Sequence, residues 1–252
     1  MGLHPARKPL LGSAPVVVGS DPTCWAGVDV GGTRKGFHLA VLDSRGHLSV
    51  AGERIATVRA VVEFLLPLAP SLVAVDAPVR PAEPGQRSRA CEREFVRAGI
   101  CALRFTPDLR ELRSNPFHDW VLHGLALYRA LDRAGLSAVE CFPTAAWTVW
   151  GGPRGTTPRT AWSARILARL QLPGTPRRLG QDARDAIGAA LTAQLHWAGE
   201  TQRFGEIVIP RAGGRWSRGG PALSSASAAA PAWAPPPASR GASPSNRRSS
   251  WS

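Results

Sequence analysis

Four aspartates stand where the sequence pattern predicts the end of a strand or the start of a helix. Asp29 closes a short apolar run and precedes two glycines, and Asp76 closes a second apolar run and precedes a proline. Asp182 and Asp185 lie three residues apart in an alanine-rich segment, so a helix there places both carboxyls on one face. These spacings make the four carboxyl groups the first candidates for a functional site.

The chemistry that suits these acids is the binding of a divalent cation. If the two apolar runs are neighbouring parallel strands, Asp29 and Asp76 meet at the sheet edge where such folds bind ligands. Aspartates a few ångströms apart repel each other, and Mg²⁺ or Mn²⁺ relieves that conflict through oxygen ligands. Asp182 and Asp185 also suit helix capping, since acids complement the N-terminal end of a helix. Capping does not account for the two strand-end acids, so the coincidence of all four favours a metal site.

The elements that must position these acids follow from apolar runs and turn residues. Strands are predicted at residues 24–30, 35–43, 47–52, 72–77, 137–142 and 207–209. Helices are predicted at residues 58–68, 87–98, 119–134, 160–170 and 182–198. The short turn between the second and third strands makes that pair antiparallel, whereas the uniformly apolar fourth strand is typical of a central parallel strand. This order predicts a mixed sheet with helices packed on it.

Four motifs in this order carry a family resemblance. The segments GVDVGGTRKGFHLAVLD, VAVDAP, VECFP and DARDAIGAALTA resemble a bacterial family of domains of unknown function that is identified as predicted nucleases of RNase H-like fold. The resemblance runs from about Ala26 to Ile209. The DxxDA motif on the last helix is also similar to the arrangement in Holliday-junction resolvases. The fold implied is α/β, with an RNase H-like mixed five-stranded sheet flanked by helices and with additional helices inserted.

The resemblance also implies roles for the aspartates. Asp29 would be the central metal ligand, Asp76 the ligand from the second strand, and Asp182 and Asp185 the ligands from the helix. The implied activity is two-metal hydrolysis of phosphodiester bonds in DNA or RNA, with Mg²⁺ or Mn²⁺ as cofactor and nucleic acid as partner. The sequence departs from RNase H itself, because no glutamate clearly matches the first-helix ligand. Glu63 lies on that helix, in an uncertain phase relative to the core face.

Several other residues leave two interpretations open. Glu140, near a strand end, is either a further acid of the site or a structural residue that contacts arginines. The segment Arg87–Arg113 mixes arginines with acids, which fits either phosphate binding or a solvated helix face with internal ion pairs. Trp147, Trp150 and Trp162 either stack on bases or lie buried. The histidines show no metal-ligand spacing, and no role is predicted for them.

Two other classes of protein fit part of the pattern. An actin-like kinase or ATPase also has a first strand ending in DxGGT, as at Asp29–Thr33, where the turn contacts nucleotide phosphates. Against that class, Asp76 is followed by Ala-Pro rather than by a second glycine turn, and the chain is short for two such domains. The other class is a non-catalytic module that binds nucleic acid or a protein on the same fold.

Composition separates the two ends of the chain from its body. Residues 211–252 consist mainly of Gly, Ser, Ala, Pro and Arg and contain no acid, so we expect a disordered tail there and a disordered arm at residues 1–22. The remaining residues, 23–210, are predicted to form the RNase H-like domain. The formal net charge of +13 falls to +5 for residues 21–210, because much of the excess lies in the ends. A mobile arginine-rich tail raises affinity for phosphate backbones, or is an unselected extension.

The cysteines and the hydropathy pattern bear on cellular location. The four cysteines are scattered, without paired or zinc-site spacing, which favours reduced thiols in a cytoplasmic protein. No run approaches about 20 apolar residues, so no membrane-spanning helix and no membrane partner are predicted. The sequence leaves the oligomeric state open.

Overall fold

The computed structural model describes residues 24–214, so the expectations for the arm at 1–22 and for the tail beyond residue 214 lie outside the described residues. Residues 211–214 form a turn directly after the last strand. The backbone N–H of Arg211 donates to the carbonyl oxygen of Glu200 at 3.0 Å, and its guanidinium donates to the carbonyl of Thr201 at 3.2 Å. The described chain thus continues a few residues past the predicted domain end.

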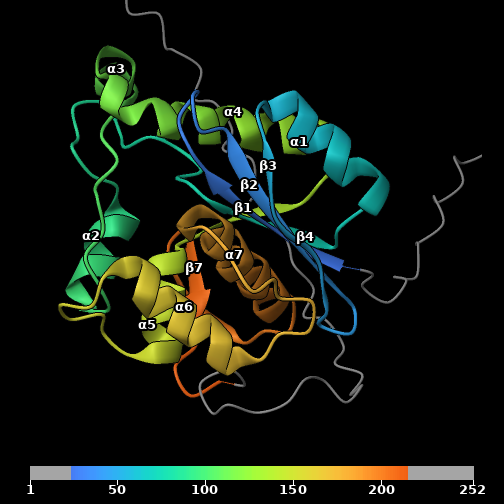
Figure 1. Cartoon of the computed structure of the whole chain (residues 1–252). Helices are drawn as coiled ribbons and strands as arrows, with labels where there is room; N and C mark the ends of the chain where they lie inside the picture. The colour runs from blue at the N-terminus through green and yellow to red at the C-terminus, as the bar shows by residue number, and fades with distance from the viewer. Residues whose placement is uncertain (1–23, 215–252) are drawn as a thin grey trace, which may run out of the picture.

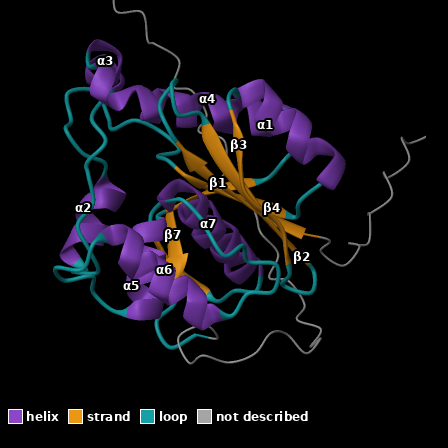
Figure 2. Cartoon of the chain, viewed as in Figure 1, coloured by secondary structure: helices purple, strands orange, loops and turns teal. Residues whose placement is uncertain are grey.

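A single mixed sheet of seven strands runs through the described residues, in the order β3-β2-β1-β4-β5-β7-β6 (Figure 2). The strands are β1 (Cys24–Val30), β2 (Phe37–Asp43), β3 (Leu48–Ile55), β4 (Leu72–Asp76), β5 (Ala138–Cys141), β6 (Thr201–Phe204) and β7 (Ile207–Pro210). The strands β1, β4, β5 and β7 are mutually parallel. Antiparallel pairing joins β2 to both β1 and β3, and joins β6 to β7.

The expected α/β class is confirmed, with a sheet wider than the five strands that the resemblance implies. The sequence pattern predicts β7, but it does not predict β6. That strand reads TQRF, which is short and mostly polar, and it lies at the sheet edge where only one side is paired. Its position depends on the hairpin with β7 rather than on a hydrophobic pattern of its own.

Helices cover both faces of the sheet (Figure 1). They are α1 (Val58–Leu65), α2 (Ala90–Arg97), α3 (Leu109–Ser114), α4 (Asp119–Arg133), α5 (Pro143–Gly151), α6 (Arg159–Leu170) and α7 (Gln181–Trp197). One face packs against α1 and α4, and the other packs against α5, α6 and α7. The sequence pattern does not predict α3 and α5. None of the helices between residues 24 and 214 is long and apolar enough to cross a bilayer.

Close packing of α7 on β1 sets the position of the site. Side chains alternate along β1, so Val28 faces the α1 and α4 side while Gly27 faces α7. A Cβ atom on Gly27 would lie 2.1 Å from the backbone nitrogen of Ala190 and 2.2 Å from the carbonyl oxygen of Ala186. Glycine at this position therefore lets the helix backbone touch the strand. Asp29, two residues further on the same face, consequently lies beside the first turns of α7.

Candidate metal centre

The two strand-end aspartates are direct neighbours in the sheet. Asp29 is the second-last residue of β1 and Asp76 is the last residue of β4, and the parallel register pairs them with each other. Neighbouring strands lie about 4.8 Å apart, and residues paired in register point to the same face. The sequence-based expectation that these two acids meet at one edge is realised in this register.

The two helix-borne aspartates lie in the first turns of α7, on the side of the sheet that Asp29 faces. The N-cap residue is Gly180, and no side chain caps this helix end. Neither Asp182 nor Asp185 therefore makes a capping hydrogen bond, although Asp182, in the first turn, still complements the helix dipole. Asp185 is buried, whereas the side chain of Asp182 is 35% exposed.

Hydrogen bonds from three side chains hold Asp185 in place. The indole N–H of Trp147 donates to Oδ1 at 2.9 Å, and the Gln181 amide donates to both carboxylate oxygens at 2.9 Å. Arg159 donates to Oδ2 at 3.0 Å through Nη2, which also contacts the Thr144 hydroxyl at 3.0 Å. These contacts fix the orientation of the Asp185 carboxylate before any ligand arrives.

The acids raise one another's pKa values. Burial, followed by the negative charges of Asp76, Asp185 and Asp182, raises the pKa of Asp29 well above its usual value. Burial and the charge of Asp185 raise the pKa of Asp76 to about 8. The pKa of Asp185 is also raised by burial, although the Arg159 guanidinium opposes that shift. The cluster therefore holds more carboxylate charge than the surrounding residues neutralise.

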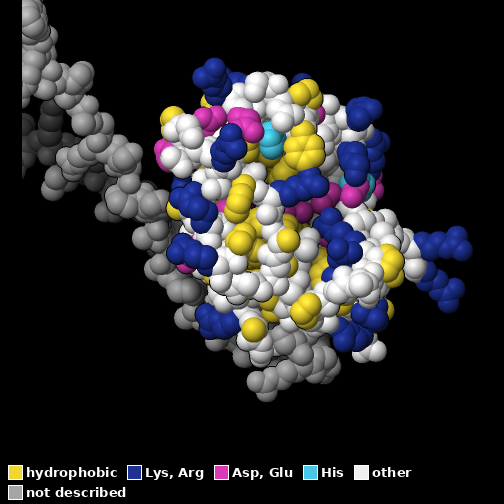
Figure 3. Space-filling model, turned by 90° about the vertical axis from the view of Figure 1, so that its left-hand side faces the viewer, with side chains coloured by type: hydrophobic (Ala, Val, Ile, Leu, Met, Phe, Trp, Pro, Cys, Tyr) yellow, Lys and Arg dark blue, Asp and Glu magenta, His cyan; other side chains and the backbone are white. Residues whose placement is uncertain are grey.

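All four aspartates line one cavity of about 810 Å³. The loop after α2, including Arg104, and the loop after α5, including Arg154, both line it. Figure 3 views the molecule from the side on which α2 and α5 lie in Figure 1, and shows acidic side chains with Lys and Arg close around them. The site thus combines an acidic floor with a basic rim.

A histidine that the sequence left without a role lies in the same cluster. Antiparallel pairing places His38 of β2 directly opposite Asp29, and its Nδ1 lies 3.9 Å from Asp29 Oδ2. One ligand atom each from Asp29, His38 and Asp182 lie within 4.8 Å of one another. Lys35, from the turn before β2, contacts Asp182 Oδ2 at 3.3 Å. The register of the β1–β2 hairpin could have predicted that His38 lies beside Asp29, because residues paired across strands share a face.

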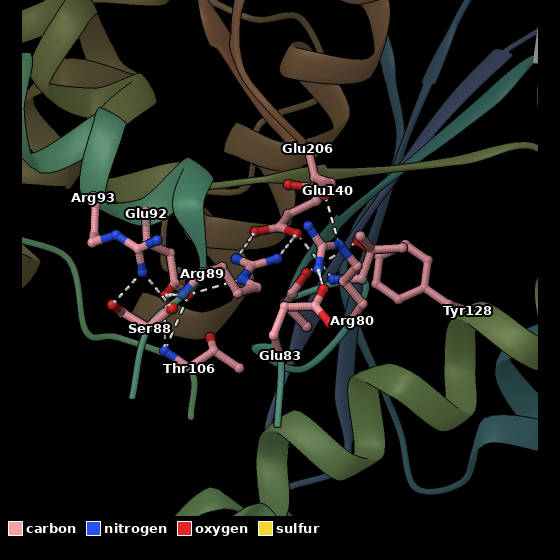
Figure 4. A network of polar contacts seen from close by, with 12 residues as sticks. Arg80, Glu83, Ser88, Arg89, Glu92, Arg93, Thr106, Tyr128, Glu140 and Glu206 are labelled. Carbon is pink, nitrogen blue, oxygen red and sulfur yellow. Dashed lines mark hydrogen bonds and ion pairs between the residues drawn. The ribbon is translucent and has the colours of Figure 1, made fainter. Parts of the chain in front are cut away.

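Glu140 lines the same cavity as the aspartates, but an arginine engages its carboxylate (Figure 4). The guanidinium of Arg89 donates to both Glu140 oxygens, at 2.7 and 2.5 Å, and its Nε donates to Glu92 at 3.0 Å. The backbone N–H of Val79 donates to Glu140 at 2.9 Å, and that of Thr106 donates to Glu92. Of the two interpretations left open for Glu140, the structure shows the contact with arginine.

This buried network also clarifies the arginine-rich segment. Arg89 is only 3% exposed and is used for ion pairing, whereas Arg104 is exposed at the cavity wall with its guanidinium 4.9 Å from the ring centre of Phe117. The arginine-rich segment therefore contributes one arginine to a buried ion-pair network and another to the exposed cavity wall.

Of the three tryptophans, Trp162 lines the cavity and Trp147 bonds Asp185, whereas the first-helix glutamate lies apart from the acids. Trp147, Trp150 and Trp162 are buried in the core beneath α5, α6 and α7, which favours packing over base stacking. Glu63 is exposed on α1 and pairs with Arg59 at 2.7 Å. Its helix covers the face opposite α7, so Glu63 does not join the four aspartates.

The donor set of the cluster fits a divalent cation. Within the described residues, Asp182 pairs with Lys35 and Asp185 pairs with Arg159, but neither Asp29 nor Asp76 pairs with an arginine or lysine. Carboxylate oxygens and an imidazole are ligands that Mg²⁺ or a first-row transition ion accepts. An ion at this position supplies the positive charge that the surrounding residues lack.

The mixed sheet with helices on both faces agrees with the fold that the sequence resemblance implies. The RuvC structure of Thermus thermophilus is similar, with 21% identity over 70% of this chain and 96% of RuvC, at a TM-score of 0.38. T. thermophilus RuvC in complex with a Holliday junction substrate is also similar, with 20% identity over 72% of this chain and 98% of RuvC, at a TM-score of 0.42. No family model and no curated protein matches the sequence.

Proposed function

We propose that this protein is a metal-dependent nuclease that hydrolyses phosphodiester bonds of DNA or RNA. The observation that carries the proposal is the convergence of four aspartates, from two strands and a helix, in one cavity. The raised pKa values of Asp29 and Asp76 support it, because the cluster lacks the positive charge that a bound cation supplies.

In such a reaction, the residues of the cavity would bind metal, orient a ligand or attract the substrate. Asp29, between the other acids, would hold metal together with Asp76 and Asp185 on one side and Asp182 on the other. When bound, two divalent ions activate the attacking water and stabilise the leaving oxygen. Arg159 keeps Asp185 oriented through its 3.0 Å contact. The exposed guanidinium of Arg154 at the cavity wall is placed to attract the phosphate backbone of a substrate.

The alternative of an actin-like kinase finds less support. In that class the turn after Asp29 faces nucleotide phosphates, but here Asp76, Asp182 and Asp185 surround the same aspartate with negative charge. In the absence of metal, a cluster of carboxylates repels a triphosphate. A carboxylate metal site also does not require a glycine turn that contacts phosphates. A non-catalytic module on the same fold is separated from a nuclease by the cleavage assay below.

The test is cleavage of a panel of single-stranded, duplex, hybrid and branched nucleic acids by purified protein. We expect cutting of at least one substrate with Mg²⁺ or Mn²⁺ and none with chelator. Asp29→Asn should remove cleavage without unfolding the protein, whereas Asp132→Asn, the same change at an exposed position of α4, should leave the rate unchanged. Full activity of Asp29→Asn, or no cutting of any substrate with any metal, would refute the nuclease function.

A further inference from the structure

The acid cluster divides into two halves on either side of Asp29. Strand β1 lies between β2 and β4, so Asp29 has a paired neighbour on each side. On the β4 side the neighbour is Asp76, and on the β2 side it is His38. All three side chains point to the α7 face, because residues paired in register share a face. One half therefore offers only oxygen, and the other offers nitrogen as well.

The helix supplies one aspartate to each half. Asp182 has a ligand atom within 4.8 Å of those of Asp29 and His38, and it contacts Lys35 from the turn that leads into β2. Asp185 is held instead by Trp147 and Arg159, which come from α5 and α6 on the other side. The i, i+3 spacing on α7 thus directs one carboxylate toward His38 and the other toward Asp76.

Distances in the β2 half fit a shared ion better than a direct hydrogen bond. His38 Nδ1 and Asp29 Oδ2 are 3.9 Å apart, which is too long for a hydrogen bond. Two ligands bound at about 2.1 Å to one octahedral ion lie about 3.0 Å apart when adjacent and about 4.2 Å apart when opposite. The three atoms, all within 4.8 Å of one another, therefore need only small side-chain adjustments to bind one cation.

The surroundings of His38 leave its ring free for this role. Its side chain is only 18% exposed, and none of the residues 24–214 forms a hydrogen bond with the imidazole. His123, the other histidine near the glycine turn, is already engaged, since its Nδ1 lies 3.0 Å from the carbonyl oxygen of Gly31 and its ring stacks on Phe37.

We propose that His38 is a nitrogen ligand of one of the two metal ions, together with Asp29 and Asp182, and that this half-site prefers Mn²⁺ to Mg²⁺. The inference rests on the two-metal function proposed above and adds that the two sites differ chemically. Imidazole favours first-row transition ions, whereas an all-carboxylate site accepts Mg²⁺ readily. In the function proposed above, Asp29, Asp76 and Asp185 would hold the other ion through oxygen alone.

Pulsed electron paramagnetic resonance of Mn²⁺ bound to untagged protein tests this directly, because a coordinated imidazole gives nitrogen-14 modulation. We expect that modulation in the wild type and in His123→Gln, and its loss in His38→Gln. Calorimetric titration should show about tenfold weaker Mn²⁺ binding at one site of His38→Gln, in line with other perturbed metal sites, and little change for Mg²⁺. In His38→Asp, oxygen replaces nitrogen, so Mn²⁺ should still bind without the modulation.

Outcomes separate this proposal from the nuclease function. Absence of nitrogen modulation in the wild type, or its persistence in both His38 variants, overturns the role of His38 even if the protein cuts nucleic acid with Mg²⁺. Modulation that depends on His38 supports the ligand assignment even if none of the substrates is cut, a result that would refute only the nuclease. The wild-type spectrum needs no variant, so poor folding of a mutant leaves the test intact.

Discussion

Arg89 and Arg159 differ in how completely they neutralise the buried carboxylates around them. Arg89 neutralises Glu140 and Glu92 with a fully buried set of hydrogen bonds. Arg159, by contrast, is half exposed; it pairs with Asp185 and also contacts the Thr144 hydroxyl. Burial raises the pKa values of Asp29, Asp76 and Glu140 alike, but of these three acids only Glu140 is paired directly with an arginine. Among residues 24–214, the charge of Arg159 opposes the raised pKa values of Asp29 and Asp76, but no arginine or lysine pairs with either, so a metal ion is expected at the cavity floor.

Arg89→Met should be strongly destabilising, because it leaves Glu140 and Glu92 as buried, unpaired charges. Removal of one partner of a buried ion pair costs about 3–5 kcal/mol. Arg93→Met is the matched control: Arg93 lies on the helix that Arg89 precedes, is exposed, and among residues 24–214 its guanidinium bonds only Ser88, so its loss should cost about 1 kcal/mol or less. Urea denaturation of the two variants measures the difference, and equal free energies of unfolding would contradict the structural role of Arg89.

At the scale of elements, the sequence predicted most of the framework and much of the site. Apolar runs predict β1 and β4, and the rule for parallel strands then predicts that Asp29 and Asp76 lie together, as the register shows. Helix periodicity likewise predicts that Asp182 and Asp185 lie on one face of the same helix. These predictions succeed because each depends on a local pattern plus one general rule of sheet or helix geometry.

The features that the sequence missed depend on contacts between distant segments. The role of Glu140 is set by Arg89, which is 51 residues away in the chain and lies on no shared periodic pattern. The short helix α5 carries two tryptophans and little amphipathic contrast, since it packs between the sheet and α6. His38 required the exact hairpin register, and a shift of one residue would have turned it to the other face.

Contact between α7 and β1 predicts a sharp effect of Gly27→Ala. The added Cβ would lie within 2.2 Å of helix backbone atoms, so α7 has to move away from the sheet. Overpacking of this kind costs about 1–3 kcal/mol or more, and displacement of α7 also moves Asp182 and Asp185 away from Asp29. We therefore expect lower stability in urea together with weaker Mn²⁺ binding by calorimetry.

Gly180→Ser is the control for that substitution. Gly180 is the N-cap of the same helix, nothing lies within 4 Å of a Cβ built there, and serine is a favoured N-cap residue. Its stability and metal binding should equal or slightly exceed those of the wild type. Wild-type behaviour of Gly27→Ala would show that α7 does not set the geometry of the acids.

At the scale of the whole molecule, an acidic cavity lies within a chain of strongly positive charge. The formal net charge is +13, and Arg104 and Arg154 at the cavity walls have no carboxylate partner among residues 24–214. Long-range attraction therefore draws a polyanion toward the protein, while the four aspartates repel its phosphates at close range. Bound cations remove that repulsion, so metal binding and nucleic-acid binding should strengthen each other.

The same charge balance predicts how metal-free stability depends on pH. Burial and neighbouring acids raise the pKa of Asp76 to about 8 in the folded protein, and they shift Asp29 and Asp185 in the same direction. The folded state thus retains protons that the unfolded chain releases above about pH 4, so stability falls as the pH rises from there through about 8. In chelator, the Tm should be several degrees lower at about pH 8 than at about pH 5.5, since each kcal/mol shifts Tm by about 2–4 °C in a chain of this size.

Asp76→Asn, which cannot titrate, should show a smaller decrease in Tm over that pH interval, measured by circular dichroism melts. Mn²⁺ should restore the wild-type Tm most strongly at the higher pH, because it binds the deprotonated carboxylates of the folded state. A metal-free Tm that rises with pH over this interval, or an unchanged slope in Asp76→Asn, would show that the acid cluster is neutralised by something other than a cation.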